Sequence, residues 1–138
     1  MNKSKTSAFQ FTGYKIERSL IEIRSTLIGE NFNISFEPKG TINKTESIFQ
    51  LDLAVSIKDK EDAINIEVDI MSLFSFDGQI EKNQLQQLFY QNAPAIIFPY
   101  IRAYITTLTA LSGIDPVIIP TLNLSGLGKE LENNTLEL

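Results

Sequence analysis

The chain has 138 residues, of which 43% are hydrophobic and 21% charged, a balance typical of one compact folded domain. It contains no cysteine and no histidine, which excludes thiolate or imidazole zinc sites, cysteine nucleophiles and Ser/His/Asp relays. The net charge of −5 and the pI near 4.7 disfavour binding to nucleic acid and suit a basic partner. We expect neither a metal nor a cofactor.

The first residues are polar and include lysines, but they contain no apolar signal region. No later segment approaches the ~20 apolar residues that a membrane span requires. We therefore expect residues 1–8 to form a flexible tail and residues 9–138 to form a single domain. The same features predict a cytoplasmic protein that does not insert into a membrane.

Alternating apolar residues predict two strands in the first third of the chain. In the segment from Tyr14 to Arg24 the apolar positions change parity, which favours a β-bulge near Leu20. The next alternation ends at Pro38 and Gly40. Its apolar members are Phe32, Ile34 and Phe36.

Two further alternations follow with little sequence between them. Residues 49–57 are apolar at every second position and end at a charged KDKED turn. Residues 64–76 continue the same pattern up to Asp77-Gly78. The turns are short enough for an antiparallel meander of four strands.

After Gly78 the apolar spacing becomes helical. Leu85, Leu88 and Phe89 begin the pattern, and residues 97–111 continue it up to Gly113. Pro99 lies inside this pattern, so we expect a kink or a restart of the helix there. Four strands followed by two helices predict an α+β fold, a four-stranded antiparallel sheet with two α-helices on one face.

The last part of the chain predicts a connector and a short helix. Residues 114–123, IDPVIIPTLN, are apolar but twice interrupted by proline, so they cannot form a regular helix or a central strand. Leu124, Leu127 and Leu131 have helical spacing, although Gly126 and Gly128 weaken that helix. The two glycines lack the neighbouring residues of a phosphate-binding loop.

Two groups of acidic residues raise the question of catalysis or metal binding. Glu67 and Asp69, with Glu22, could form a carboxylate pair for acid–base work, but alternating acids opposite an apolar face indicate a solvated strand. Asp59 and the acids that follow it, Glu61 and Asp62, could hold a hard cation, but their spacing is that of a charged turn. We therefore predict that the protein is not an enzyme.

Apolar residues in two places exceed what one core face needs. Leu73 has the opposite parity to Phe74 and Phe76, so both sides of that strand end carry bulky groups. The connector holds a second apolar group, which nothing obvious covers: Val117, Ile118, Ile119 and Leu122. The two places together are consistent with a binding groove, or with an ordinary core and a stray surface residue.

The segment NAPAIIFPYIRAYITTLTALSGIDPVIIPTLNLSGL, from Asn92 to Leu127, closely resembles the signature region of the SecB family of bacterial protein-export chaperones. That region has a P-x-I-[LI]-F-P-Y-x-R motif, a helix, a proline-containing apolar loop and an N-[FL]-x-x-L motif. Upstream, IEVDIMSLFSFDG resembles the fourth strand of the family. The matching positions are Pro94, Ile96, Ile97, Phe98, Pro99, Tyr100, Arg102, Pro116, Pro120, Asn123 and Leu127.

The resemblance implies a homotetramer built as a dimer of dimers, which holds unfolded preproteins in a translocation-competent state and delivers them to the SecA motor. Apolar surface can recognise unfolded chains without a sequence code. The client-binding positions that the resemblance implies are Phe32, Ile34, Phe36, Leu73, Phe74, Phe76, Ile118, Ile119 and Leu122.

The resemblance also implies a docking patch for the motor on the outward sheet face, at Glu67 and Glu22, although a first-strand acidic position of the family falls on Arg18. An apolar helix face that includes Tyr104 and Leu108 would leave a large exposed patch on a monomer, so we predict that it forms part of the oligomer interface. Two alternatives remain open from the sequence: a SecB-like chaperone dedicated to an antitoxin of a toxin–antitoxin system, and an oligomeric scaffold without client binding.

Overall fold

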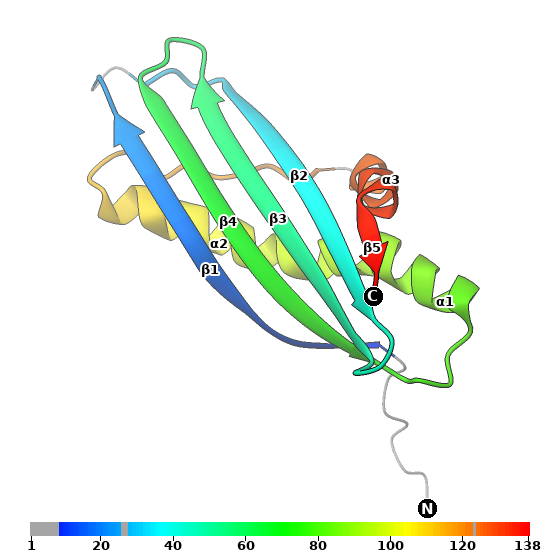
Figure 1. Ribbon diagram of the computed structural model, residues 1–138. Coiled ribbons are helices and arrows are strands. Elements are labelled where there is room, and N and C mark those ends of the chain that lie inside the picture. Colours follow the sequence, from blue (N-terminus) through cyan, green and yellow to red (C-terminus); the bar gives the residue numbers. More distant parts are fainter. Residues whose placement is uncertain (1–8, 26–27, 123) are drawn as a thin grey trace, which may run out of the picture.

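A computed structural model describes residues 9–25, 28–122 and 124–138 (Figure 1). The predicted tail at residues 1–8 and the motif residue Asn123 lie outside the described residues. Four long strands form the body of the sheet: β1 (Phe9–Ile23), β2 (Phe32–Asn43), β3 (Ile48–Asp59) and β4 (Ile64–Phe76).

The order of strands across the sheet is β1-β4-β3-β2-β5. The predicted meander is correct for β2, β3 and β4, but β1 lies beside β4 instead of β2. The connection between β1 and β2, residues 24–31, is longer than a usual hairpin loop, which is consistent with this non-adjacent pairing. β1 and β2 therefore lie at opposite edges of the four antiparallel strands.

The bulges in β1 differ from the prediction near Leu20. The register with β4 shifts between Phe11 and Gly13 and again between Ile16 and Arg18, whereas Leu20 lies in regular register opposite Glu67. The register shift between Ile16 and Arg18 could not be predicted from the apolar pattern, because the residue that faces the helix layer after it, Ser19, is polar. The hydroxyl of Tyr104 donates a hydrogen bond to the Ser19 hydroxyl over 3.0 Å, which satisfies it there.

A fifth strand, β5 (Thr135–Glu137), corrects the predicted four-stranded sheet. It pairs in parallel with β2 along Gly40–Ile42. Three residues are too few for an alternating pattern to be recognised, so the sequence contained no usable signal for this strand.

The helical layer begins with α1 (Lys82–Gln87), a π-helical turn η1 (Leu88–Asn92) and α2 (Ala93–Leu111). The chain does not restart at Pro99, which lies exposed inside α2. The irregular turn comes earlier, directly before Pro94, whose ring nitrogen cannot donate to the carbonyl of Tyr90 one helical turn back. The predicted short helix is α3 (Ser125–Asn133), and residues 114–122 have no regular secondary structure, as expected.

The core lies between the sheet and the helices on one of its faces, and the opposite face stays open (Figure 1). At its centre the rings of Phe49 and Phe89 stack with centroids 3.6 Å apart, and Phe9 stacks on Phe74 at 4.9 Å. Apolar burial of this kind is the main stabilising contribution in a small domain. Within the described part of the chain, no helix is long and apolar enough to cross a membrane.

Candidate functional site

β2 has an outer edge that is only partly paired. The N–H of Gly40 donates to the carbonyl of Asn134 over 3.1 Å, and the carbonyl of Ile42 accepts from the N–H of Leu138 over 2.8 Å. Backbone groups alternate in direction along a strand, so the even-numbered residues of β2 face this edge. Phe32, Ile34 and Phe36 therefore turn their N–H and C=O groups outward, where no described strand pairs with them.

Pro38 separates the paired part of this edge from the open part. It has no N–H, and its carbonyl accepts a hydrogen bond from the side-chain amide of Asn134 over 3.2 Å. A strand that pairs along Gly40–Ile42 therefore cannot continue with full pairing towards Phe36.

The side chains beside the open edge are apolar and only partly buried. Phe32, Ile34 and Phe36 point towards the helix layer and pack against the core without being enclosed by it. The ring of Phe36 lies 6.4 Å from that of Phe98 on α2. We call Phe32, Ile34, Phe36 and Phe98 the edge strip. Phe98 was not among the predicted site residues, although it belongs to the FPY motif.

The connector contributes one exposed apolar residue. Ile118 is 63% exposed, whereas its neighbours Val117 and Ile119 are buried. Two threonines of α2 fix this alternation: Thr106 donates to the Val117 carbonyl over 3.0 Å, and the Val117 N–H donates to the Thr109 hydroxyl over 2.8 Å. Leu122 is half-buried against the core.

The aromatic residues of β4 lie in the core. Phe74 is completely buried, between Phe9 and Phe49, and Phe76 packs edge-on against Phe89 with centroids 5.7 Å apart. Leu73 is half-buried on the opposite face of the sheet. The structure thus brings together the β2 members of the predicted client-binding set, but it places Phe74, Phe76 and Ile119 beneath the surface and Leu73 on the far side.

A second partly exposed apolar cluster lies at the β1 edge. The rings of Tyr14 and Tyr100 are 5.0 Å apart, and Phe11 lies 5.4 Å from Tyr100. Tyr14 and Tyr100 are 42% and 41% exposed. Tyr104 and Leu108, the predicted interface residues, are half-buried on the same helix. Tyr100 was not predicted for the interface, although it lies one helical turn before Tyr104.

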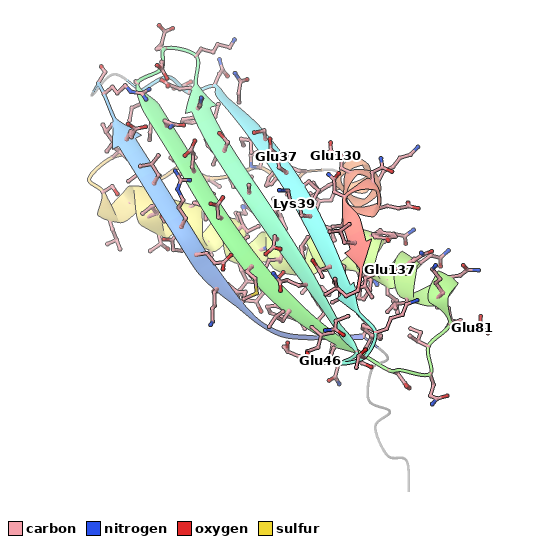
Figure 2. All side chains as sticks on the ribbon, viewed as in Figure 1. Glu37, Lys39, Glu46, Glu81, Glu130 and Glu137 are labelled. Carbon is pink, nitrogen blue, oxygen red and sulfur yellow. The ribbon has the colours of Figure 1, made fainter. Side chains whose placement is uncertain are left out.

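The open face of the sheet carries the predicted docking residues. Arg18 on β1 forms ion pairs with Glu67 at 2.8 Å and Asp69 at 3.8 Å, so the local charge is partly neutralised. The hydrogen bond and the charge of Glu67 raise the pKa of Arg18. Glu22 lies near the end of the same face, 3.3 Å from Arg24, and accepts a hydrogen bond from Asn65. Glu37 and Lys39 continue this face onto β2 (Figure 2).

The charged KDKED segment is a turn, as predicted. Asp59 is buried, and its carboxylate accepts hydrogen bonds from the N–H groups of Ala63 at 2.8 Å and Ile64 at 3.1 Å. Burial raises the pKa of this carboxyl, but the backbone hydrogen bonds outweigh it and leave the pKa below its ordinary value. No group of three possible ligands is placed to hold a metal ion among the described residues.

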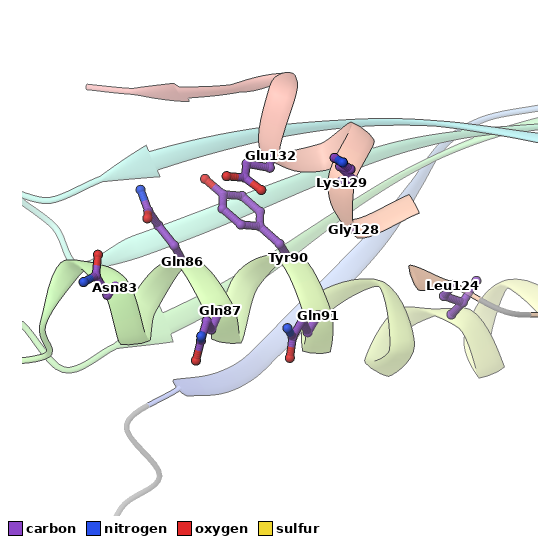
Figure 3. A pocket seen from close by; sticks show the side chains of 9 residues that line it. All are labelled: Asn83, Gln86, Gln87, Tyr90, Gln91, Leu124, Gly128, Lys129 and Glu132. Atoms are coloured by element: carbon purple, nitrogen blue, oxygen red, sulfur yellow. The ribbon is translucent and has the colours of Figure 1, made fainter. Parts of the chain in front are cut away.

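A polar groove separates the first helical segment from α3 (Figure 3). It has a volume of about 680 Å³. Asn83, Gln86, Gln87 and Gln91 line one side, and Gly128, Lys129 and Glu132 of α3 line the other. Tyr90 projects between the two sides, and burial raises the pKa of its hydroxyl. The carboxamides form hydrogen bonds but carry no charge, so this groove differs in chemistry from the edge strip.

Comparison with known proteins identifies relatives in bacteria and archaea. An uncharacterised protein of Methanocaldococcus jannaschii is 30% identical over 91% of this chain and 85% of its own length. The protein-export protein SecB of Saccharophagus degradans is 31% identical over 72% of this chain and 58% of its own length.

The fold is shared with the solved structure of the SecB-like chaperone of Mycobacterium tuberculosis in complex with a peptide from the HigA1 antitoxin. The identity is 18% and the TM-score 0.71, over 85% of this chain and 89% of that one. The family described as preprotein translocase subunit SecB matches residues 30–133, which include the edge strip, the connector and all of α3. This chain therefore belongs to the SecB family.

Proposed function

We propose that this protein is a cytoplasmic holding chaperone that binds unfolded preproteins and keeps them competent for translocation. One observation carries the proposal: an unpaired stretch of sheet edge lies directly beside a row of half-exposed apolar side chains. Neither feature involves chemistry on a bound molecule, and the proposed function includes no catalytic step.

The two features suit an unfolded polypeptide for different reasons. Apolar side chains of a client leave water when they contact the edge strip, whatever their order in sequence. The open N–H and C=O groups of Phe32, Ile34 and Phe36 can pair with any extended main chain, as in strand addition. Together they favour extended apolar segments without specifying a sequence.

The proposed contact set is narrower than the predicted one. We propose direct client contact for Phe32, Ile34 and Phe36, for the exposed Ile118 and for Leu122. Phe74, Phe76 and Ile119 are buried in the core and are not part of the proposed contact set. Leu73 belongs to the open sheet face and is not part of the proposed contact set.

Delivery to SecA is the second part of the proposal, with Glu67 and Glu22 as the docking residues. Carboxylates on an exposed face can orient a basic partner through charge complementarity. Arg18 occupies Glu67 in the free protein and must be displaced, or must accept a shared carboxylate, when such a partner binds.

A homotetramer, a dimer of dimers, is the proposed assembly. Tyr104 and Leu108 form the helix side of its interface, next to the exposed Tyr14 and Tyr100. Aromatic surface of this kind is typical of subunit interfaces.

A dedicated antitoxin is the second candidate client. It is favoured by the structural neighbour, which was solved with an antitoxin peptide. The same edge strip would serve either client, so the two candidates differ in the partner and not in the physics of binding.

A holding assay tests the proposal. The purified protein is mixed with an unfolded secretory precursor, and the precursor that stays soluble is measured with and without SecA. Ile34→Asp should abolish holding because it places a charge on the edge strip, whereas Ser35→Asp adds the same charge on the opposite face and should retain it. Equal activity of the two variants would contradict the assignment. Holding of a cognate antitoxin, without holding of secretory precursors, would favour the second candidate.

A further inference from the structure

β5 occupies part of the edge that the proposed function assigns to clients. It runs parallel to β2 and pairs with Gly40–Ile42, directly beyond Pro38 (Figure 1). The open part of the edge, Phe32–Phe36, and the occupied part belong to one strand and turn the same even-numbered residues outward. The chain therefore shows, within itself, that this edge accepts an extended segment.

A small, partly open pocket of mixed polar and apolar lining lies beside β5, with a volume of about 180 Å³. Its apolar lining comes from Ile42, Phe76, Ile80 and Leu85. Its polar lining comes from Lys44, Lys82, Gln86 and Glu137. Glu137 of β5 lies at its rim and forms ion pairs with Lys44 at 3.4 Å and with Lys82 at 3.7 Å.

The attachment of β5 to the sheet is weak in chemical terms. Leu136 is 69% exposed and Leu138 is 74% exposed, so their side chains bury little apolar surface. The two ion pairs of Glu137 are solvent-accessible, and exposed pairs of this kind contribute little to stability. What remains is a short parallel ladder along Gly40–Ile42, with the hydrogen bond from the Asn134 side chain to the Pro38 carbonyl beside it. Gly40 permits this close approach, because an added Cβ would lie 2.5 Å from the Thr135 hydroxyl.

We infer that β5 is a displaceable occupant of the β2 edge, and that an extended polypeptide replaces it and inserts one apolar side chain into the pocket beside it. The inference rests on the proposed holding function and adds to it a built-in competitor and a second subsite. Displacement would extend the available edge from Phe32–Phe36 to include Gly40 and Ile42.

Two substitutions at one position test the competition. The parallel register places the N–H of Leu136 opposite the carbonyl of Gly40. Leu136→Pro removes this N–H, and Leu136→Ala removes the same side chain but keeps it. Binding of reduced and alkylated α-lactalbumin, which cannot refold, should tighten about fivefold in the proline variant, as expected when pairing at one or two hydrogen bonds becomes available. The alanine variant should bind as the parent does.

Two further measurements are independent of client binding. Hydrogen exchange of the Gly40 amide, which donates to Asn134, should accelerate in Leu136→Pro, and the fluorescence of bound anilinonaphthalene sulfonate should rise as the pocket opens. If the proline variant does not fold, Glu137→Gln provides the milder release, with Glu130→Gln as its control on α3.

The outcomes separate the inference from the function on which it rests. If the parent holds α-lactalbumin and the released variants bind no more tightly than their controls, β5 is not a competitor and the inference is wrong. If no variant holds the client although exchange and dye binding show that the pocket has opened, the holding function is wrong and the displaceable strand remains.

Discussion

Arg18 is the residue that most changes the chemistry of the open sheet face. It bridges Glu67 and Asp69, which would otherwise present two adjacent negative charges to a partner. A basic partner can form ion pairs with those carboxylates only to the extent that the guanidinium of Arg18 gives up its own ion pairs with them. Arg18 therefore gives this acidic patch an internal counter-ion.

We predict that Arg18→Gln strengthens the binding of SecA by up to about fivefold, because an exposed ion pair usually contributes about 0.2 to 1 kcal/mol. Lys15→Gln is the matched control: it lies on the same strand and face and makes the same change in net charge, but Lys15 forms no ion pair with the described residues. Titration calorimetry at low and high salt measures both. Equal effects of the two substitutions would show that only net charge matters.

Asp59 links the turn between β3 and β4 to the segment before β2, through its hydrogen bonds with Ala63, Ile64 and Gly29. Its pKa is lowered in the folded protein, so its contribution to stability is present above its unfolded pKa of about 4 and is lost as the pH falls through the folded value.

We predict that Asp59→Ala lowers the melting temperature at neutral pH and that this deficit shrinks as the pH falls below about 4. The variant leaves three backbone N–H groups without their acceptor, and two of them belong to the buried residues Ala63 and Ile64. Glu61→Ala, at an exposed position of the same turn, should melt as the parent does. Thermal melts across this pH range check the prediction, and a deficit that is independent of pH would contradict the assigned protonation.

Among the elements, those with long regular patterns could be predicted from the sequence. β3 and β4 alternate without interruption and were located correctly. In β1 the second bulge lies at Glu17, and it places the polar Ser19 on the inner face of the sheet. An alternation of apolar and polar residues does not predict a polar residue there. The position of β1 beside β4 depends on pairing between distant segments, and local patterns contain no information about it.

The π-helical turn and β5 were missed for different physical reasons. η1 precedes Pro94 because the carbonyl of Tyr90, one turn earlier, loses its hydrogen-bond donor. The predicted kink or restart was assigned to Pro99 instead, but α2 continues through Pro99. β5 forms because Gly40 leaves room for Thr135 against β2, a contact between residues almost a hundred positions apart.

Two glycines of α3 offer a matched test of how this element is attached. A Cβ on Gly128 would collide with the backbone carbonyl of Tyr90, whereas a Cβ on Gly126 would meet no atom. We predict that Gly128→Ala lowers the free energy of unfolding by about 1 to 3 kcal/mol through overpacking. Gly126→Ala should raise it by about 0.5 to 1 kcal/mol through helix propensity. Chemical denaturation measures both, and a stabilised Gly128→Ala would contradict the close approach.

At the scale of the whole molecule, the candidate site could be predicted only in part. The β2 residues were predicted from the resemblance to the SecB family, and Ile118 from that resemblance and from an apolar connector that nothing obvious covers. Phe74, Phe76 and Ile119 are equally apolar, but the tertiary packing of β4 and α2 buries them. Whether an apolar residue lies in the core or at the surface depends on which other segments pack over it, and a single sequence does not contain this information.

The Tyr14 and Tyr100 cluster lies at the β1 edge, whereas the edge strip lies along β2, at the opposite edge of the four antiparallel strands. Ile118 lies in the connector behind the sheet and not on the strand of the tyrosine cluster. Assembly and client binding can therefore be tested separately. A monomer would leave the tyrosine cluster in water, which soluble proteins usually avoid when such a patch is large.

We therefore predict that the parent is a tetramer and that Tyr100→Asp reduces it to smaller species, because a charge would be buried without a partner in the interface. Ile118→Asp introduces the same charge at a residue that is 63% exposed, and it should keep the tetramer while weakening client binding by roughly tenfold, as for the loss of one apolar anchor. Light scattering and the holding assay read the two effects separately. A monomeric parent would refute the assembly, and a client-binding loss in Tyr100→Asp equal to that in Ile118→Asp would show that holding depends on the intact tetramer.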